Sequence, residues 1–169
     1  PPDPWSTVRR LVYYVATSLD GYIAQDDGGF AAFPNDPATL TALFAEYPET
    51  CPAHVRGALG VDAPPRHFDT VVMGRRTYDP ALQLEITDPY PHLRTLVVSA
   101  SLPPTADDAV EIVRTNPVAR IRELKAEPGL GIYLAGGATL AGELLDEIDR
   151  VVIKTYPVIA GEGIPLLRH

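Results

Sequence analysis

The sequence has 169 residues, of which 46% are hydrophobic and 21% are charged, and this balance fits one globular domain with a buried core. Its net charge of −8 argues against a general nucleic-acid surface and favours small-molecule partners. A single cysteine excludes an internal disulfide, and no apolar run approaches the roughly 18 residues that cross a bilayer. We therefore expect one domain over residues 1–169, with a tail at residues 1–8. With no leader pattern at the start, we also expect a cytoplasmic protein without membrane partners.

The first predicted element is a central strand over residues 10–17, where β-branched and aromatic residues form a nearly continuous apolar run. A turn over residues 18–21, an extended segment over residues 22–24 and a glycine-rich loop over residues 25–29 follow it. Asp20 lies in the turn. A plain β-turn explains an Asp-Gly pair here, and the alternative is that the Asp20 carboxylate projects into a cleft at the end of the strand.

Residues 35–47 give the clearest helix signal. Asp36 is placed to cap the helix, Pro37 suits its first position, and apolar residues recur at helical spacing. We expect this apolar stripe to join the core rather than to form a binding surface. Residues 48–67 are rich in proline and carry no strong period, so we expect an irregular insertion with about one helical turn between residues 54 and 59.

A second buried strand is expected over residues 68–73. It leads directly into a turn whose residue types can bind an anion: Gly74, Arg75, Arg76 and Thr77. Main-chain N–H groups and a hydroxyl can hold a phosphate, and a guanidinium can grip one through two hydrogen bonds. The alternative is that both arginines are solvated surface charges. Pro80 is expected to limit the helix that begins here to about one turn.

Three further segments continue the alternation of strands and helices. We expect a strand over residues 94–101, an edge strand over residues 109–114 and a helix opened by Asn116 and Pro117. A last long strand is expected over residues 149–159. Strands that alternate with helices predict an α/β domain with a largely parallel sheet and a ligand cleft at the carboxyl ends of its strands.

The most informative stretch is a short buried strand over residues 132–135, followed by Gly136 and Gly137 and then a helix. Two glycines allow a ligand to approach the main chain, and the first N–H groups of the helix favour an anion such as a pyrophosphate. A tight turn between strand and helix is the alternative. The helix is expected to present one apolar face, formed by Leu140, Ala141, Leu144, Leu145 and Ile148.

Five stretches resemble the ordered landmarks of the dihydrofolate reductase-like superfamily: residues 15–24, 72–78, 97–101, 133–140 and 157–163. They are most similar to the reductase (C-terminal) domain of the bifunctional riboflavin-biosynthesis deaminase-reductases and to stand-alone relatives of that domain. The deaminase half has no counterpart, because one cysteine cannot supply its zinc ligands. The resemblance implies a three-layer α/β fold, in which helices flank a mixed, mostly parallel sheet, and a cofactor, NADPH, across the strand ends.

The resemblance also assigns parts of the cofactor to residues. The pyrophosphate would lie between the Gly74 turn and the Gly136 turn, and the ribose with its 2′-phosphate would meet two serines and an arginine, which favours NADPH over NADH. The nicotinamide would touch main chain in the first strand, under a mobile flap over residues 25–33. The implied cofactor-binding residues are Ala16, Ile23, Gly74, Arg75, Arg76, Thr77, Ser99, Ser101, Ala135, Gly136, Gly137, Ala138, Thr139 and Leu140.

The implied chemistry is hydride transfer to a C=N or C=O carbon of a small heterocyclic or carbonyl substrate, related to 5-amino-6-(5-phosphoribosylamino)uracil reductase. Asp20 is the expected catalytic residue, and Asp20, Phe33 and Thr39 are the expected substrate-binding residues. Thr39 stands where dihydrofolate reductases carry the carboxylate that holds the pterin, which disfavours folate reduction. No metal is expected, since the four histidines lack ligand spacing.

Two other functions stay open at this point. A true dihydrofolate reductase would bind folate analogues. A dinucleotide-binding module without chemistry would bind the cofactor and turn over no substrate, and the absence of an evident proton donor keeps that alternative. The resemblance further implies a homodimer, to which the apolar last strand could contribute, and one more strand after residues 161–167, where the printed sequence ends at His169.

Overall fold

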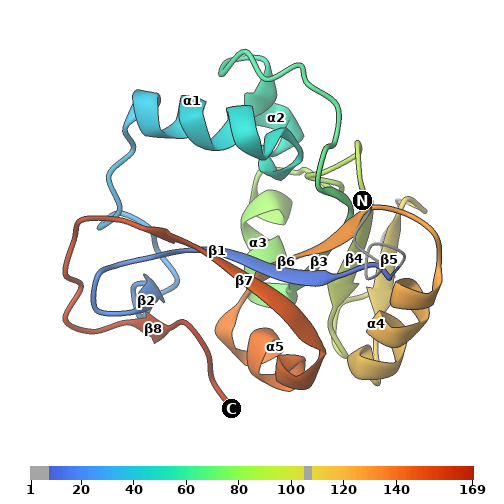
Figure 1. The fold of residues 1–169 in the computed structure, drawn as a ribbon. Coiled ribbons are helices and arrows are strands. Elements are labelled where there is room, and N and C mark those ends of the chain that lie inside the picture. The colour runs from blue at the N-terminus through green and yellow to red at the C-terminus, as the bar shows by residue number, and fades with distance from the viewer. Residues whose placement is uncertain (1–7, 105–107) are drawn as a thin grey trace, which may run out of the picture.

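The computed structural model describes residues 8–104 and 108–169, so all but the last residue of the expected tail at residues 1–8 lie outside the described residues. Six strands form one sheet in which every neighbouring pair is parallel (Figure 1). Across the sheet the order is β5 (Val110–Val113), β4 (Arg94–Val98), β3 (Phe68–Gly74), β6 (Gly131–Gly136), β1 (Leu11–Thr17) and β7 (Ile148–Thr155). The predicted α/β class with a mostly parallel sheet is confirmed.

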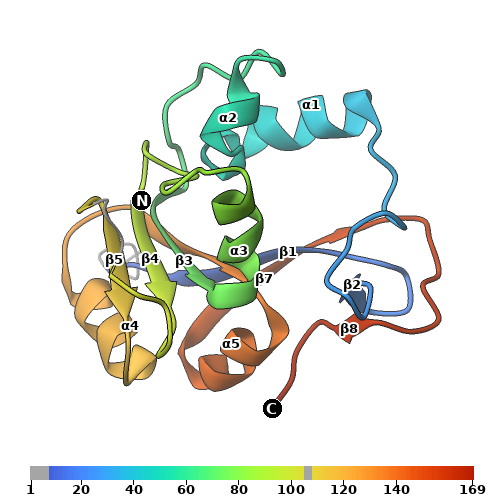
Figure 2. The same ribbon diagram turned by 180° about the vertical axis from the view of Figure 1, so that it is seen from behind.

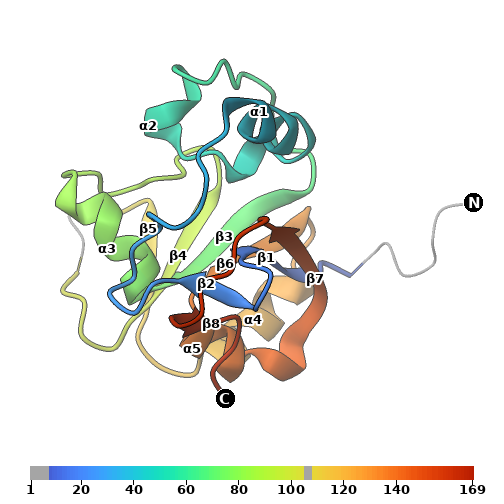
Figure 3. The same ribbon diagram turned by 90° about the vertical axis from the view of Figure 1, so that its left-hand side faces the viewer.

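A separate antiparallel pair, β2 (Tyr22–Ala24) with β8 (Ile164–Pro165), lies near the ends of β1 and β7 (Figure 3). The helices of the described residues are α1 (Pro37–Glu46), α2 (Ala53–Arg56), α3 (Arg75–Gln83), α4 (Pro117–Ala126) and α5 (Ala138–Glu143), with 3-10 turns η1 (Pro48–Thr50) and η2 (Leu145–Glu147). Figures 1 and 2 show α4 and α5 on one side of the sheet and α1, α2 and α3 on the other. The chain therefore has the expected three layers.

Strand β1 contributes side chains to the hydrophobic cores on both faces of the sheet. Successive side chains of a strand point to opposite faces. Tyr13 and Val15 accordingly pack with α4 and α5, while Val12 and Tyr14 pack on the other face, in the core that contains Tyr78 of α3. Burial on both faces explains why the run over residues 10–17 is apolar almost throughout.

Helix α1 begins as predicted, because the Asp36 carboxylate accepts a hydrogen bond from the Thr39 N–H at 2.8 Å. The expectation that its apolar stripe joins the core was wrong, since no residue of α1 is buried. The helix lies apart from the sheet (Figure 1), and four of its residues line a cavity: Thr39, Ala42, Leu43 and Glu46. The sequence period showed an amphipathic helix correctly, but it did not show what the apolar face meets.

Helix α3 runs over nine residues, so the expectation that Pro80 limits it to one turn was wrong. Pro80 is the sixth helical residue, and it removes only the hydrogen bond to the Arg76 carbonyl near the start of the helix. The helix continues because Tyr78 and Ala81 are buried beneath it, and burial of a large side chain stabilises by about 1.5–3 kcal/mol, comparable to the cost of the proline.

Other boundaries also differ from the expectations. Strand β4 ends at Val98 rather than at residue 101, and α5 ends at Glu143, so Leu145 is left 42% exposed. Strand β7 ends at Thr155 rather than at residue 159, because its partner β1 ends opposite it at Thr17 and Pro157 has no N–H for a ladder.

The insertion over residues 48–67 is more regular than expected. It contains η1, whose three residues are buried, and α2, the expected helical turn, which begins at Ala53. Glu49 is 0% exposed. Its carboxylate accepts hydrogen bonds from the N–H groups of His67 at 2.6 Å and Phe68 at 2.8 Å. These bonds tie the insertion to the start of β3.

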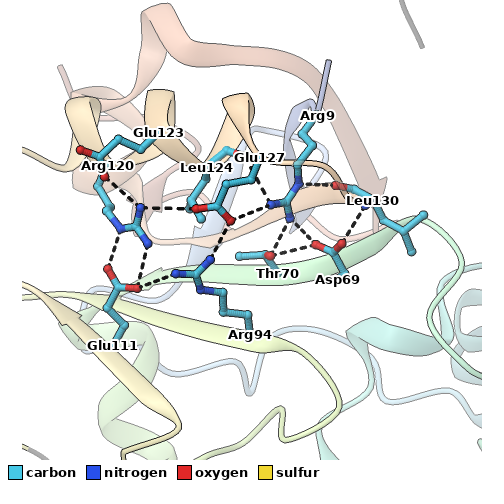
Figure 4. A network of polar contacts seen from close by, with 10 residues as sticks. All are labelled: Arg9, Asp69, Thr70, Arg94, Glu111, Arg120, Glu123, Leu124, Glu127 and Leu130. Atoms are coloured by element: carbon cyan, nitrogen blue, oxygen red, sulfur yellow. Dashed lines mark hydrogen bonds and ion pairs between the residues drawn. The ribbon is translucent and has the colours of Figure 1, made fainter. Parts of the chain in front are cut away.

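A buried arginine joins the amino ends of the sheet strands (Figure 4). Arg9 is 5% exposed. Its guanidinium donates hydrogen bonds to the carbonyls of Leu130 at 2.7 Å and Leu124 at 3.3 Å. It also donates to the Asp69 carboxylate and to the Thr70 hydroxyl. This network lies at the end of the sheet opposite to the predicted ligand cleft, so its role is structural.

Candidate functional site

The two glycine turns of the sequence meet in space. Strands β3 and β6 are neighbours, with Met73 opposite Gly136. A Cβ atom added to Gly74 would lie 3.7 Å from both the Gly136 carbonyl oxygen and the Gly137 nitrogen. Gly136 has a φ of +116°, a conformation that favours glycine. The backbone is therefore open on this side, and the first turns of α3 and α5 begin side by side.

The Thr77 side chain lies between these two turns. A Cβ atom added to Gly136 or to Gly137 would lie 3.8 Å from the Thr77 hydroxyl oxygen. The N-cap residues of the two helices, Gly74 and Gly137, provide no side-chain hydrogen bond to the first turn. Two sets of uncapped helix N–H groups with a hydroxyl between them form a cradle for an anion.

The two arginines of the α3 turn are in different situations. The Arg75 guanidinium donates to the Asp79 carboxylate one turn further along the helix. Arg76 is exposed and makes no ion pair within residues 8–104 and 108–169. Of the pair, Arg76 is therefore the guanidinium that is available to a ligand.

The two predicted serines after β4 also differ. Ser99 is buried, and its hydroxyl accepts a hydrogen bond from the Leu102 N–H at 3.1 Å, which orders the turn that follows the strand. Ser101 is exposed. Ser101 can therefore meet a bound molecule without first breaking a hydrogen bond of the turn.

Asp20, the expected catalytic residue, makes hydrogen bonds to another loop of the protein. Its exposed carboxylate accepts hydrogen bonds from the N–H groups of Ala160 at 3.0 Å and Gly161 at 2.7 Å. Hydrogen bonds from Ser18 and from these two N–H groups lower the pKa of Asp20 to about 2. An ionised carboxylate is an acceptor and not a proton donor, so this geometry gives Asp20 a structural role that joins two loops.

A cavity of about 740 Å³ lies between α1 and the carboxyl-terminal half of β7. Thr39 lines it from α1, while Phe33 contacts its wall, with its ring edge-on to Tyr156 at a centroid distance of 5.5 Å. The structure thus brings Thr39 and Phe33 to one cavity and leaves Asp20 outside its lining. The lining residues are Tyr14, Pro34, Asp36, Thr39, Ala42, Leu43, Glu46, Tyr47, Val152, Ile153, Lys154, Thr155, Tyr156 and Pro157.

The remaining predicted cofactor residues lie in or beside the sheet. Ala16 is half-buried near the end of β1, opposite Lys154 in the β1–β7 ladder. Ile23 is in β2 and packs against the core on the α5 side. Ala135 is half-buried in β6, whereas Ala138 and Leu140 of α5 are buried and Thr139 is exposed.

Lys154 is the site residue that the sequence analysis missed. Its ammonium lies 4.3 Å from the centroid of the Tyr14 ring, an arrangement in which the ring attracts the cation. Burial lowers the pKa of Lys154 to about 8. A lysine two residues after Val152, and therefore on the same side of the strand, was the signal that could have revealed it.

Residues 9–168 match the family model described as the RibD C-terminal domain. The chain belongs to the RibD C-terminal domain family. This result confirms the family resemblance of the sequence landmarks, and it assigns the domain to a reductase-like family associated with riboflavin biosynthesis.

Individual relatives of this RibD C-terminal domain agree with the assignment. The uncharacterised protein YwjB of Bacillus subtilis strain 168 is 31% identical over 163 residues, which cover 95% of this chain and 84% of YwjB. The uncharacterised YyaP of the same organism is 23% identical over 171 residues, 94% of this chain and 80% of YyaP. A crystal structure from Shewanella sp. PV-4, of a protein assigned provisionally to riboflavin biosynthesis, superposes with a TM-score of 0.64 at 27% identity, covering 95% of this chain and 84% of that one. Within the described ranges, no helix of this RibD C-terminal domain has the length and apolarity needed to cross a membrane.

Proposed function

We propose that this RibD C-terminal domain is an NADPH-dependent reductase, related to 5-amino-6-(5-phosphoribosylamino)uracil reductase, that transfers a hydride to a C=N or C=O carbon of a small heterocyclic or carbonyl compound. The observation that carries the proposal is the convergence of two uncapped helix starts at Gly74 and Gly137, with the Thr77 hydroxyl between them. Such a cradle suits a pyrophosphate, since both helices direct N–H groups and positive dipole ends toward it.

The preference for NADPH over NADH rests on Arg76 and Ser101. Arg76 is exposed at the start of α3 with no described ion pair, and Ser101 is exposed beyond β4. Because β3 and β4 are neighbouring parallel strands, both side chains follow the same edge of the sheet. A guanidinium can hold a 2′-phosphate through two hydrogen bonds, which a ribose hydroxyl cannot match.

The substrate would occupy the cavity beneath α1. This cavity borders β7, whose Lys154 is paired with Ala16 of β1, the residue proposed to touch the nicotinamide. The nicotinamide supplies the hydride when it is bound, and the protein contributes the apolar walls that hold the acceptor beside it and exclude water. Thr39 lines this cavity, and its hydroxyl donates a hydrogen bond to the Asp36 carboxylate at 2.6 Å. Position 39 therefore offers a neutral hydroxyl rather than a carboxylate that could bind a pterin.

The proposal is tested by calorimetric titration with NADPH and, separately, with NADH at one ionic strength. We expect NADPH to bind at least tenfold more tightly, a difference of about 1.4 kcal/mol. The Arg76→Ala variant should lose this preference, and Arg66→Ala, which removes the same charge from the distant insertion, should keep it. Absence of binding to either dinucleotide would overturn the proposal. NADPH binding without oxidation of the cofactor by any small carbonyl or imine compound would instead support the non-catalytic module.

A further inference from the structure

We propose that the cavity beneath α1 selects flat ring compounds that carry one negative charge, and that the ammonium group of Lys154 recognises this charge. The inference rests on the proposed function, because it names the substrate class of the cavity assigned there to the substrate. Three features of the cavity support it: the shape of its walls, the isolation of its cation and the position of that cation in the sheet.

The walls of the cavity suit a flat apolar ring. Tyr14 is 2% exposed, and its ring contacts the Tyr47 ring at a centroid distance of 4.7 Å with a tilt of 42° between the ring planes. Leu43 of α1 and Val152 of β7 also line the space that these rings border. A volume of about 740 Å³ accommodates a ring system of two or three fused rings.

The cation of the cavity has no partner of its own. Among the described lining residues, Lys154 is the one cationic side chain, and no ion pair to it occurs within residues 8–104 and 108–169. Two carboxylates also line this cavity, and neither forms an ion pair with Lys154 among the described residues. Asp36 caps the helix through Thr39, and Glu46 lies 3.5 Å from the imidazole of His67.

The Tyr14 ring faces Lys154 but does not replace a counter-ion. Attraction between an ammonium and a ring offsets only part of the lost hydration, and burial lowers the pKa of Lys154 to about 8. An anionic ligand would supply the negative charge that Lys154 lacks, so the cavity favours an anion over a neutral molecule of equal shape.

The sheet register places the charge near the reacting end of the proposed cofactor. Lys154 pairs with Ala16 across the β1–β7 ladder. A ring whose acidic group meets Lys154 is therefore held beside the main chain of Ala16. A carboxylate or a comparably acidic ring nitrogen or oxygen would satisfy this geometry.

The affinity for such a ligand should depend on pH in a definite direction. The ammonium form binds the anion, and the pKa of Lys154 is about 8 without ligand, so the affinity should be constant below pH 8 and fall by up to about tenfold per unit above it. The other ionisable groups that line the cavity are Tyr14, Asp36, Glu46, Tyr47 and Tyr156. Phenols ordinarily titrate at about pH 10 and carboxylic acids at about pH 4, so a step between pH 8 and pH 9 belongs to the amine.

The test uses two probes of the same shape, naphthalene-2-carboxylate and naphthalene-2-carboxamide, titrated into the whole chain at pH 7. We expect the carboxylate to bind at least tenfold more tightly than the amide. Lys154→Met should abolish the difference, and Lys154→Arg should retain most of it. Arg150→Met is the matched control, because it removes a positive charge from the same face of β7 four residues away, outside the cavity lining. Circular dichroism and thermal melting confirm that each variant is folded.

Three outcomes would overturn the inference: equal binding of the two probes, no binding of either probe, or a preference that survives in Lys154→Met. The NADPH titration is performed on the same samples, so the two proposals fail separately. A Lys154-dependent preference without NADPH binding would leave the anion site standing and refute the reductase. NADPH binding without a preference for the carboxylate probe would refute the anion site and leave the reductase proposal standing.

Discussion

The substitution Gly74→Ala should weaken cofactor binding without lowering the stability of the fold. Gly74 has φ −82° and ψ 168°, which alanine adopts readily, and its added Cβ would make contacts of 3.7 Å, ordinary van der Waals distances. Glycine to alanine at a compatible position stabilises by about 0.4–1 kcal/mol, because the unfolded chain loses freedom. The same methyl group would stand over Gly136 and Gly137, where a pyrophosphate must approach the main chain. We therefore expect a slightly higher melting temperature and at least tenfold weaker NADPH binding.

The control for this substitution is Gly57→Ala. Gly57 has helical dihedral angles, and a Cβ atom added to it would meet nothing within 4 Å. It should give a similar gain in urea stability and leave NADPH affinity unchanged. If Gly74→Ala binds NADPH as tightly as the wild-type chain does, the phosphate does not lie between the two helix starts. If Gly74→Ala unfolds the protein, the contact distances above do not describe the site.

Further substitutions test the energetics of the fold by urea denaturation. Arg9→Met should destabilise by about 3 kcal/mol, because it removes a buried guanidinium and leaves the Leu130 carbonyl and the Thr70 hydroxyl without its hydrogen bonds. Arg94 has a side chain that is 43% exposed, so Arg94→Met should lower the free energy of unfolding by less than about 1 kcal/mol. Equal losses in Arg9→Met and Arg94→Met would refute the conclusion that the buried arginine contributes more. Tyr13→Phe loses a 2.8 Å hydrogen bond to a main-chain carbonyl and should cost about 1 kcal/mol. Asp20→Asn should lower stability at neutral pH. Because the folded pKa of about 2 is below the unfolded value of 3.8, the stability deficit should disappear between pH 4 and pH 2, and a deficit that persists at pH 2 would refute the linkage.

The parts of the fold that the sequence predicts are those that local physics determines. Continuous apolar runs identified β1, β3 and β6, since a central parallel strand is buried on both faces. Glycine after two of these strands identified the turns at Gly74 and Gly136. The sheet order then brought the two turns together, and this step needs only the rule that parallel strands end at the same edge.

The parts that the sequence analysis predicted wrongly or did not predict depend on partners remote in the chain. Pro80 is tolerated inside α3 because the residues beside it are buried by other elements. Strand β7 stops at Thr155 because β1 stops opposite it. The carboxylate of Asp20 meets N–H groups 140 residues away, at Ala160 and Gly161. No local pattern carries such information, since propensity and periodicity describe only neighbours along the chain.

The two halves of the candidate site differ in how the fold supports them. The cradle at Gly74 and Gly136 is made of main chain at the ends of two adjacent central strands, so any displacement would break the ladder between β3 and β6. The substrate cavity has one wall on the sheet and one wall on α1, a helix with no buried residue. Its sheet wall fixes Lys154, while its helix wall is held by the capping bond of Asp36 and by the loops at either end. Substitutions in α1 can therefore reshape this cavity without disturbing the sheet or the two glycine turns at its edge.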